Sequence, residues 1–171
     1  MKNIFLITLL LISSIVLSQE NEFNVGINGG ITNGNIKNIA SGALGLDANY
    51  LFDIVDDVKF GPAVNVLYFF TKENNNIKPD PFIYLPIGGA VRFHGIGEKF
   101  NVGADIGYAI GISPSGDRGG IFFKPMLGYD ITEKLSLNIF YAGVKKKQPT
   151  YSYLGLGIVF NVFGKDNYYT F

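Results

Sequence analysis

The stretch VKFGPAVNVLYFF at residues 58–70 alternates large apolar residues with small or polar ones. Val64 and Val66 fall on one face of an extended chain, and Ala63 and Asn65 fall on the other. Successive side chains of a β-strand point to opposite faces, so this period of two predicts a strand with one apolar face.

The same alternation returns along the chain in about eight segments of about ten residues each. The segments are 23–31, 44–52, 58–70, 83–93, 100–111, 121–131, 135–142 and 153–162. Short connections (53–57, 95–99, 132–134) alternate with longer polar ones (32–38, 71–80, 113–119, 145–150). No segment has a helical period, and we expect no helix among them. The pattern predicts an all-β fold, an eight-stranded antiparallel up-and-down barrel with turns on one side and loops on the other.

The first residues, MKNIFLITLLLISSIVLS at 1–18, have the features of a cleavable signal peptide. Lys2 supplies the positive start, residues 4–16 form the apolar run, and Ser18 is acceptable beside a cleavage site. The run is shorter than the ~20 residues that a membrane anchor needs. We therefore predict a signal peptide at 1–18 and one barrel domain at 19–171.

Composition favours a barrel in a membrane over a soluble one. Charged residues make up only 16% of the chain and aromatic residues make up 15%. The net charge is zero, so nucleic acid is not an expected partner. Without cysteine the chain has no disulfide and no thiolate metal site. A soluble barrel of lipocalin type remains the rival, but it would need a charged outer face where this chain offers mostly Gly and Asn. Phe60 at one strand end and Tyr68 and Phe70 at the other predict two aromatic girdles around an aliphatic band.

Six charged residues fall on the predicted inner face. They are Asp47, Lys59, Arg92, Asp105, Lys124 and Asp130. The predicted register brings Asp105 within diagonal reach of Lys124. Such a set suits either a salt-bridged plug or a path for protons or ions, and the narrow lumen of an eight-stranded barrel favours the plug.

Three prolines, Pro62, Pro86 and Pro125, fall inside predicted strands. Each removes a hydrogen-bond donor from the sheet, which a closed barrel should resist. We expect a bulge or a strand end at these positions. The functional alternative is a gap in the wall through which a lipid chain enters sideways.

With the signal peptide, the eight segments and the inner charges, the chain resembles the small outer-membrane barrel families. These are the OmpA-type transmembrane domain, the OmpX/Ail type, the OmpW type and the "outer membrane protein beta-barrel domain" group, and the resemblance covers about residues 22–163. It implies the outer membrane of a Gram-negative bacterium, with membrane lipid and lipopolysaccharide as neighbours.

The resemblance also implies a signal for the barrel-assembly machinery in the last strand. The residues that match such a signal are Gly157, Phe160, Val162 and the terminal Phe171. In these families the last strand usually closes the chain, whereas here GKDNYYTF at 164–171 follows it.

Three functions remain open from the sequence. The first, which we favour, is a structural or interaction barrel that stabilises the envelope or presents its loops. The second is a narrow channel or conduit for small hydrophobic solutes, as in the OmpW type. The conduit hypothesis is supported by aromatic residues on the predicted inner face, which are Phe69, Phe82, Tyr84, Phe122 and Phe140.

The third is an enzyme that modifies lipid A, a class that uses His with Ser at the outer rim. The only histidine, His94, lies beside a short turn, while Ser113, Ser115 and Asp117 share a loop on the other side. We therefore predict no enzyme, and we expect no cofactor and no metal site.

A basic run, Lys145, Lys146 and Lys147, falls where the seventh strand leaves the membrane. It is interpreted either as a solvated loop edge or as a contact to lipopolysaccharide phosphates.

Overall fold

The computed structural model describes residues 21–73, 79–97, 99–146 and 150–163. Within these residues, eight antiparallel strands close into one barrel in sequence order, as predicted. The strands are β1 (Glu22–Asn33), β2 (Ala40–Val55), β3 (Val58–Thr71), β4 (Phe82–Phe93), β5 (Phe100–Ser113), β6 (Gly120–Thr132), β7 (Leu135–Lys145) and β8 (Tyr151–Phe163). A single 3-10 turn, η1 (Gly34–Ile36), follows β1. The predicted signal peptide at 1–18 lies outside the described residues.

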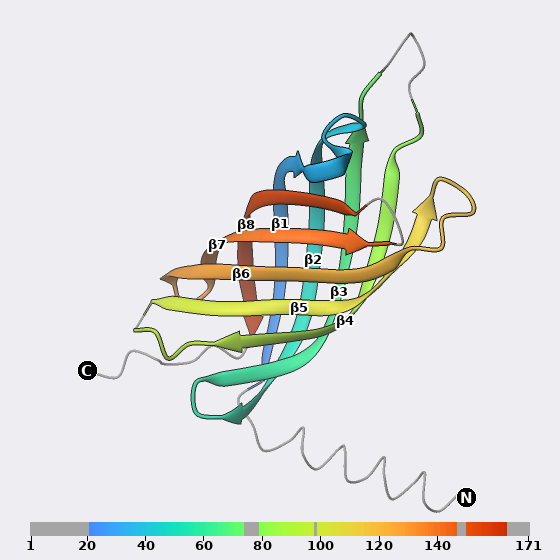
Figure 1. Ribbon diagram of the computed structural model, residues 1–171. Coiled ribbons are helices and arrows are strands. Elements are labelled where there is room, and N and C mark those ends of the chain that lie inside the picture. Colours follow the sequence, from blue (N-terminus) through green and yellow to red (C-terminus); the bar gives the residue numbers. More distant parts are fainter. Residues whose placement is uncertain (1–20, 74–78, 98, 147–149, 164–171) are drawn as a thin grey trace, which may run out of the picture.

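The connections divide the barrel into two ends (Figure 1). We call the end with the connections β2–β3, β4–β5 and β6–β7 the turn end, and the end with the other connections the loop end. The β2–β3 turn is shorter than predicted, because only Asp56 and Asp57 separate the strands. Asp57 has φ 65°, a left-handed conformation that Asp tolerates in tight turns.

The burial of β3 shows how the sequence pattern builds the wall. From Lys59 to Phe70 buried and exposed residues alternate without a break. Phe69 is 0% exposed in the barrel interior, whereas its neighbour Phe70 is 41% exposed on the outside. A large apolar face therefore points outward, the reverse of a soluble barrel.

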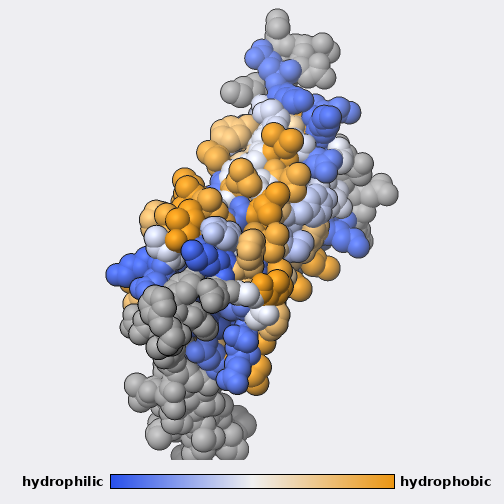
Figure 2. Space-filling model, turned by 90° about the vertical axis from the view of Figure 1, so that its left-hand side faces the viewer, coloured by the Kyte–Doolittle hydropathy of each residue, from blue (hydrophilic) through white to orange (hydrophobic). Residues whose placement is uncertain are grey.

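The outer surface carries an aliphatic band between two aromatic rows, which matches the girdles that the sequence predicts. On the face shown in Figure 2, apolar side chains gather over the middle of the barrel and hydrophilic ones toward its ends. The row at the turn end contains Phe23, Tyr50, Phe52, Phe60, Phe93, Phe100, Tyr129, Phe160 and Phe163. The row at the loop end contains Tyr68, Phe70, Tyr108, Phe123 and Tyr141. Such a surface suits a bilayer core bounded by two interfaces.

The prolines do not end strands or form bulges, and this expectation was wrong. Pro62, Pro86 and Pro125 lie inside continuous strands. Pro62 still pairs with β4, Pro86 with β5 and Pro125 with β5. On the opposite side of each proline the neighbour is β2 for Pro62, β3 for Pro86 and β7 for Pro125. There the ladder skips two residue pairs and then resumes in the same register. A missing N–H therefore interrupts one seam locally, while the rest of the closed sheet keeps the register.

The register shifts lie near strand ends instead. They fall between Phe23 and Asn24, Ala40 and Gly42, Asp53 and Val55, Ile83 and Tyr84, and Asp130 and Thr132. Bulges at the rims of a barrel adjust its closure without breaking its middle. No helix among the described residues is long and apolar enough to cross a membrane.

Candidate functional site

The lumen at the turn end is lined by polar side chains. Lys59 of β3 contacts Glu22 of β1 at 2.7 Å and Asp53 of β2 at 3.1 Å. Arg92 of β4 contacts Asp105 of β5 at 2.7 Å. Because each buried cation lies against a carboxylate, the cost of taking these charges out of water is partly offset.

Asparagine side chains add further hydrogen bonds to this polar lining. Asn24 donates to Asn49 at 3.1 Å and accepts from Asn161 at 3.0 Å. Asp130 accepts hydrogen bonds from Asn101 and Ser136. Asparagine both donates and accepts, so it can link charged groups without adding a charge of its own.

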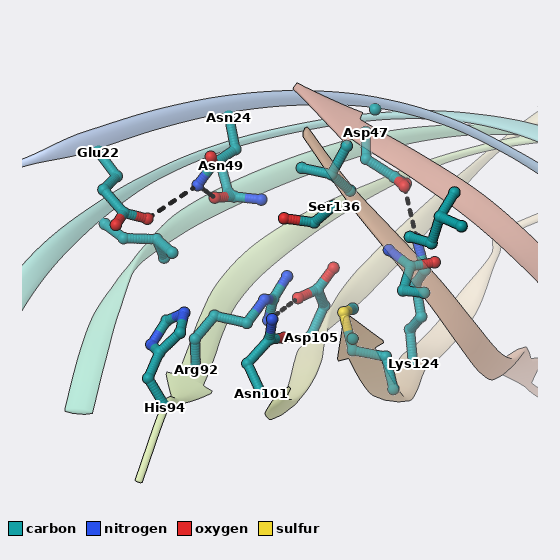
Figure 3. Close-up of a pocket in the computed structure, with 17 residues that line it drawn as sticks. Glu22, Asn24, Asp47, Asn49, Arg92, His94, Asn101, Asp105, Lys124 and Ser136 are labelled. Atoms are coloured by element: carbon teal, nitrogen blue, oxygen red, sulfur yellow. Dashed lines mark hydrogen bonds and ion pairs between the residues drawn. The ribbon is translucent and has the colours of Figure 1, made fainter. Parts of the chain in front are cut away.

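A small cavity of about 50 Å³ lies within this polar region. Figure 3 shows Asn24, Asn49, Arg92, Asp105 and Lys124 around it. The volume is enough for a few water molecules, and the polar lining provides them with partners. The turn half of the lumen is therefore an ion-paired compartment with room for water.

A chain of polar contacts crosses the middle of the lumen. Lys124 of β6 contacts Asp47 of β2 at 2.5 Å, and Asn28 of β1 donates to the same Asp47 oxygen at 2.8 Å. Tyr153 donates to Asn28 at 2.8 Å, and the Lys124 ammonium lies 4.7 Å from the centre of the Phe140 ring. Lys124 and Tyr153 thus join the polar half to the aromatic half beyond.

The loop half of the lumen is filled by aromatic rings. Phe69 lies at the centre, with its ring 6.1 Å from Tyr84, 6.1 Å from Tyr151 and 5.6 Å from Tyr153. The buried apolar residues packed together here are Ile36, Ala40, Ala43, Leu67, Phe69, Tyr84, Ala109, Phe122, Phe140, Ala142, Val144, Tyr151 and Tyr153. Close packing of this kind fills space that a pore would need.

Beyond the rings, the loop end carries one more charged contact. Asp117, in the β5–β6 loop, contacts the Lys146 ammonium and accepts from the Tyr84 hydroxyl at 2.7 Å and from the Gly119 amide at 2.8 Å. Burial acts to raise the pKa of Asp117, but the hydrogen bonds from Lys146, Gly119 and Tyr84 outweigh it and hold the pKa below its usual value.

All six inner charges that the sequence singled out lie on the lumenal side, but they combine differently from the predicted diagonal pair. Asp105 stands directly opposite Lys124 in the sheet, yet its ion pair is with Arg92, and that of Lys124 is with Asp47 across the lumen. The sequence reasoning missed Glu22 and Asp53. Extending the alternation one step beyond the predicted strand ends would have placed both on the inner face.

The residues predicted as an assembly signal divide between the two faces of β8. Gly157 faces inward against Asn28 and Asn138, whereas Phe160 and Val162 are exposed on the outer surface. Phe171 lies outside the described residues.

The basic run does not form a single row of three cations. Lys145 is exposed on the outer side of β7, Lys146 turns inward to Asp117, and Lys147 lies outside the described residues.

His94 lines the cavity at the turn end, and its backbone amide donates to Asp57 at 2.9 Å. Ser113, Ser115 and Asp117 lie at the loop end. His94 is therefore not brought together with Ser113, Ser115 or Asp117. Within the part of the chain that the structure describes, no group of three His, Cys, Asp or Glu side chains is placed to hold a metal ion.

Solved structures similar to this chain include small transmembrane barrels. The crystal structure of Ail, the attachment invasion locus protein of Yersinia pestis, matches with a TM-score of 0.56 at 13% identity, over 82% of this chain and 97% of that one. The structure of the outer membrane protein Ail in a phospholipid nanodisc matches with a TM-score of 0.55 at 12% identity, over 82% and 99%. A de novo designed transmembrane β-barrel matches with a TM-score of 0.51 at 12% identity, over 82% and 95%.

No protein-family model matches the chain. No curated protein matches it either. At these identities the structural likeness establishes the fold, which is that of the small outer-membrane β-barrels.

Proposed function

We propose that this chain is exported by its signal peptide at 1–18, inserts into the outer membrane of a Gram-negative bacterium, and serves there as a closed structural barrel that presents its loops. The short turns would face the periplasm and the longer loops the outside, as is usual for such barrels. The apolar outer band and the two aromatic rows support the membrane location.

The observation that carries the closed-barrel proposal is the aromatic layer in the loop half of the lumen. Phe69, Phe122, Phe140 and Tyr153 are each no more than 2% exposed. Ions would have to displace packed rings to pass. The polar half of the lumen, toward the turn end, then acts as an ion-paired plug that is closed by the aromatic layer and does not conduct.

Two measurements test this proposal. An outer-membrane fraction run on a detergent gel should show a band whose mobility changes on boiling, because a closed barrel resists detergent until it is heated. Purified protein in a planar bilayer should give no steady conductance. A soluble periplasmic protein with no mobility shift would contradict the location, and regular conductance steps would contradict the plug.

Ail is described as an attachment invasion locus protein. By analogy with a barrel of the same fold, the loops of this chain would be where an outside partner binds. Lys145, which is exposed on the outer side of β7 at the loop end, would meet lipopolysaccharide phosphates. Lys145→Gln should weaken retention on lipopolysaccharide, and unchanged retention would remove Lys145 as a contact.

For biogenesis, Phe160 and Val162 would be read by the barrel-assembly machinery. Replacing both with Ala should lower the amount of inserted protein, whereas the exposed pair Leu154 and Leu156 of the same strand provides a matched control.

A hydrophobic conduit is the second candidate, and the interrupted seams beside Pro62, Pro86 and Pro125 are the observation that favours it. A lipophilic molecule that copurifies with the protein, found by mass spectrometry and lost on replacing the prolines, would support this function over the structural one.

A further inference from the structure

The loop end of the lumen holds a lysine ammonium between two aromatic rings and a carboxylate. The Lys146 ammonium lies 4.8 Å from the centre of the Tyr84 ring and 4.5 Å from that of the Tyr151 ring. It also contacts the Asp117 carboxylate, and the side chains of Lys146 and Asp117 are only 16% and 9% exposed. The ionic and aromatic contacts converge on the charged end of one side chain.

The carboxylate is held in place by groups other than Lys146. The Tyr84 hydroxyl donates to one oxygen and the Gly119 amide to the other. Gly119 has φ 77°, and a Cβ there would lie 1.7 Å from the Ala109 carbonyl oxygen, so only glycine fits this turn. The Tyr108 hydroxyl also donates to the Arg118 carbonyl at 2.7 Å and fastens the same loop. Asp117 should therefore stay in position when no ammonium is present.

The rings of Tyr84 and Tyr151 are also held by other aromatic rings of the lumen. Tyr151 packs against Phe82 at 4.8 Å and against Phe69 at 6.1 Å, and Tyr84 packs against Phe69 at 6.1 Å. These contacts belong to the aromatic layer and do not involve Lys146.

A carboxylate beside aromatic faces is the arrangement by which proteins recognise ammonium groups. Lys146 follows the last residue of β7, whereas its neighbour Lys145 belongs to the strand and points outward. Lys146 thus enters the site as a ligand attached to the chain. The rest of the site consists of residues from β4, β8 and the β5–β6 loop.

We propose that the loop end is a binding site for primary alkylammonium groups, such as the side chain of a lysine in a peptide or a polyamine, and that Lys146 occupies it in the closed form. An outside ammonium competes with Lys146 for Asp117 and the rings of Tyr84 and Tyr151. The proposal goes beyond the structural role, and the site exists whether or not the lumen conducts.

Because Lys146 is attached to the chain, its effective concentration at the site is high, and the site is rarely vacant in the wild-type protein. The apparent affinity for an outside ammonium falls in proportion to the vacant fraction. Removing the Lys146 ammonium should therefore raise the affinity for an added alkylammonium by about tenfold or more.

The test is a titration of Lys146→Gln with n-butylammonium chloride in a non-ionic detergent, since phosphocholine detergents carry an ammonium of their own. The Gly119 amide, which donates to Asp117, reports site occupancy by its NMR shift. We expect saturable binding to Lys146→Gln and binding about tenfold weaker or more to the wild type. The matched control is Lys145→Gln, which removes the same charge outside the site and should behave as the wild type.

Asp117→Asn in the Lys146→Gln background should abolish the saturable binding. The proposal is overturned when Lys146→Gln binds butylammonium no more tightly than the wild type or Lys145→Gln, or when the Asp117→Asn double variant binds equally well. Should Lys146→Gln fail to give the heat-shifted band of a folded barrel, Lys146→Met keeps the aliphatic stem and is titrated in its place. Conductance plays no part in this readout, so a failure here is distinct from a failure of the closed-barrel proposal.

Discussion

The two halves of the lumen are built from the same strands but by opposite means. In β3 the inner face carries Lys59 and Asn65 toward the turn end, then Leu67 and Phe69 toward the loop end. The turn half combines ion pairs with a small polar cavity, and the loop half is packed with rings. The comparison teaches that paired charges and apolar packing can each fill one half of the same narrow lumen, and our proposal is that the two together close it.

The largest expected effect comes from removing a ring in the packed half. Phe69→Ala should lower the free energy of unfolding by about 3 to 5 kcal/mol, because the neighbouring rings cannot fully close the space. Denaturant unfolding of the refolded protein in detergent micelles measures it. Phe70→Ala, next in the chain but facing outward, should cost much less. Equal losses for the two variants would mean that the loop half is not packed.

Breaking a charge pair where the halves meet should cost somewhat less, because the cavity beside the pair has room for water to solvate the remaining charge. Lys124→Gln leaves Asp47 without its cation and should lower the free energy of unfolding by about 3 kcal/mol. The same unfolding experiment applies. Lys134→Gln, at an exposed turn, is the control and should change little. A loss for Lys124→Gln no larger than for the control would show that the pair does not matter.

A smaller effect is expected for the hydrogen bond that joins the two halves. Tyr153→Phe keeps the ring in the aromatic layer and removes only the donor to Asn28, so about 1 kcal/mol should be lost. A loss as large as that of Phe69→Ala would mean that the polar link, rather than the packing, stabilises the loop half.

The smallest effect concerns pH at the loop end. The pKa of Asp117 is lowered in the folded protein, so its contribution to stability is present above the unfolded pKa and is lost only as the pH falls through the lower folded pKa. Protection of the Gly119 amide from hydrogen exchange, corrected for the intrinsic rate, should therefore be the same at about pH 7 and pH 5. Loss of that protection by pH 5 would contradict the proposed hydrogen bonds to Asp117.

The alternation of residues was sufficient to predict the strands, the two faces and the inward position of Phe69 and Tyr84. It could not predict which charges pair, because Lys124 and Asp47 belong to β6 and β2, which are not neighbours in the sheet. Reasoning from register reaches only adjacent strands, whereas a closed lumen brings opposite walls together. The inward position of Lys146 was missed for a simpler reason, because the predicted segment stopped at residue 142 and the alternation of β7 continues past it to Lys146.

The prolines show a different limit. Sequence rules for sheets treat Pro62 as a strand breaker, because a proline in a strand that is paired on both sides removes one donor from the ladder. In a closed barrel the residues on both sides of Pro62 remain paired, and the ladder with β2 resumes in register after two skipped pairs. Closing the sheet into a barrel holds each strand between two neighbours, and the residue pattern of a single strand does not contain that constraint.

The most direct test of the divided lumen uses the absence of cysteine from the chain. Ser136 lines the polar cavity, and Ala142 is fully buried in the aromatic half. In vesicles of known orientation, a charged thiol reagent should label Ser136→Cys from the turn side only and should label Ala142→Cys from neither side. Rapid labelling of Ala142→Cys from the loop side, in protein that keeps its heat-shifted band, would contradict a lumen closed by its aromatic half.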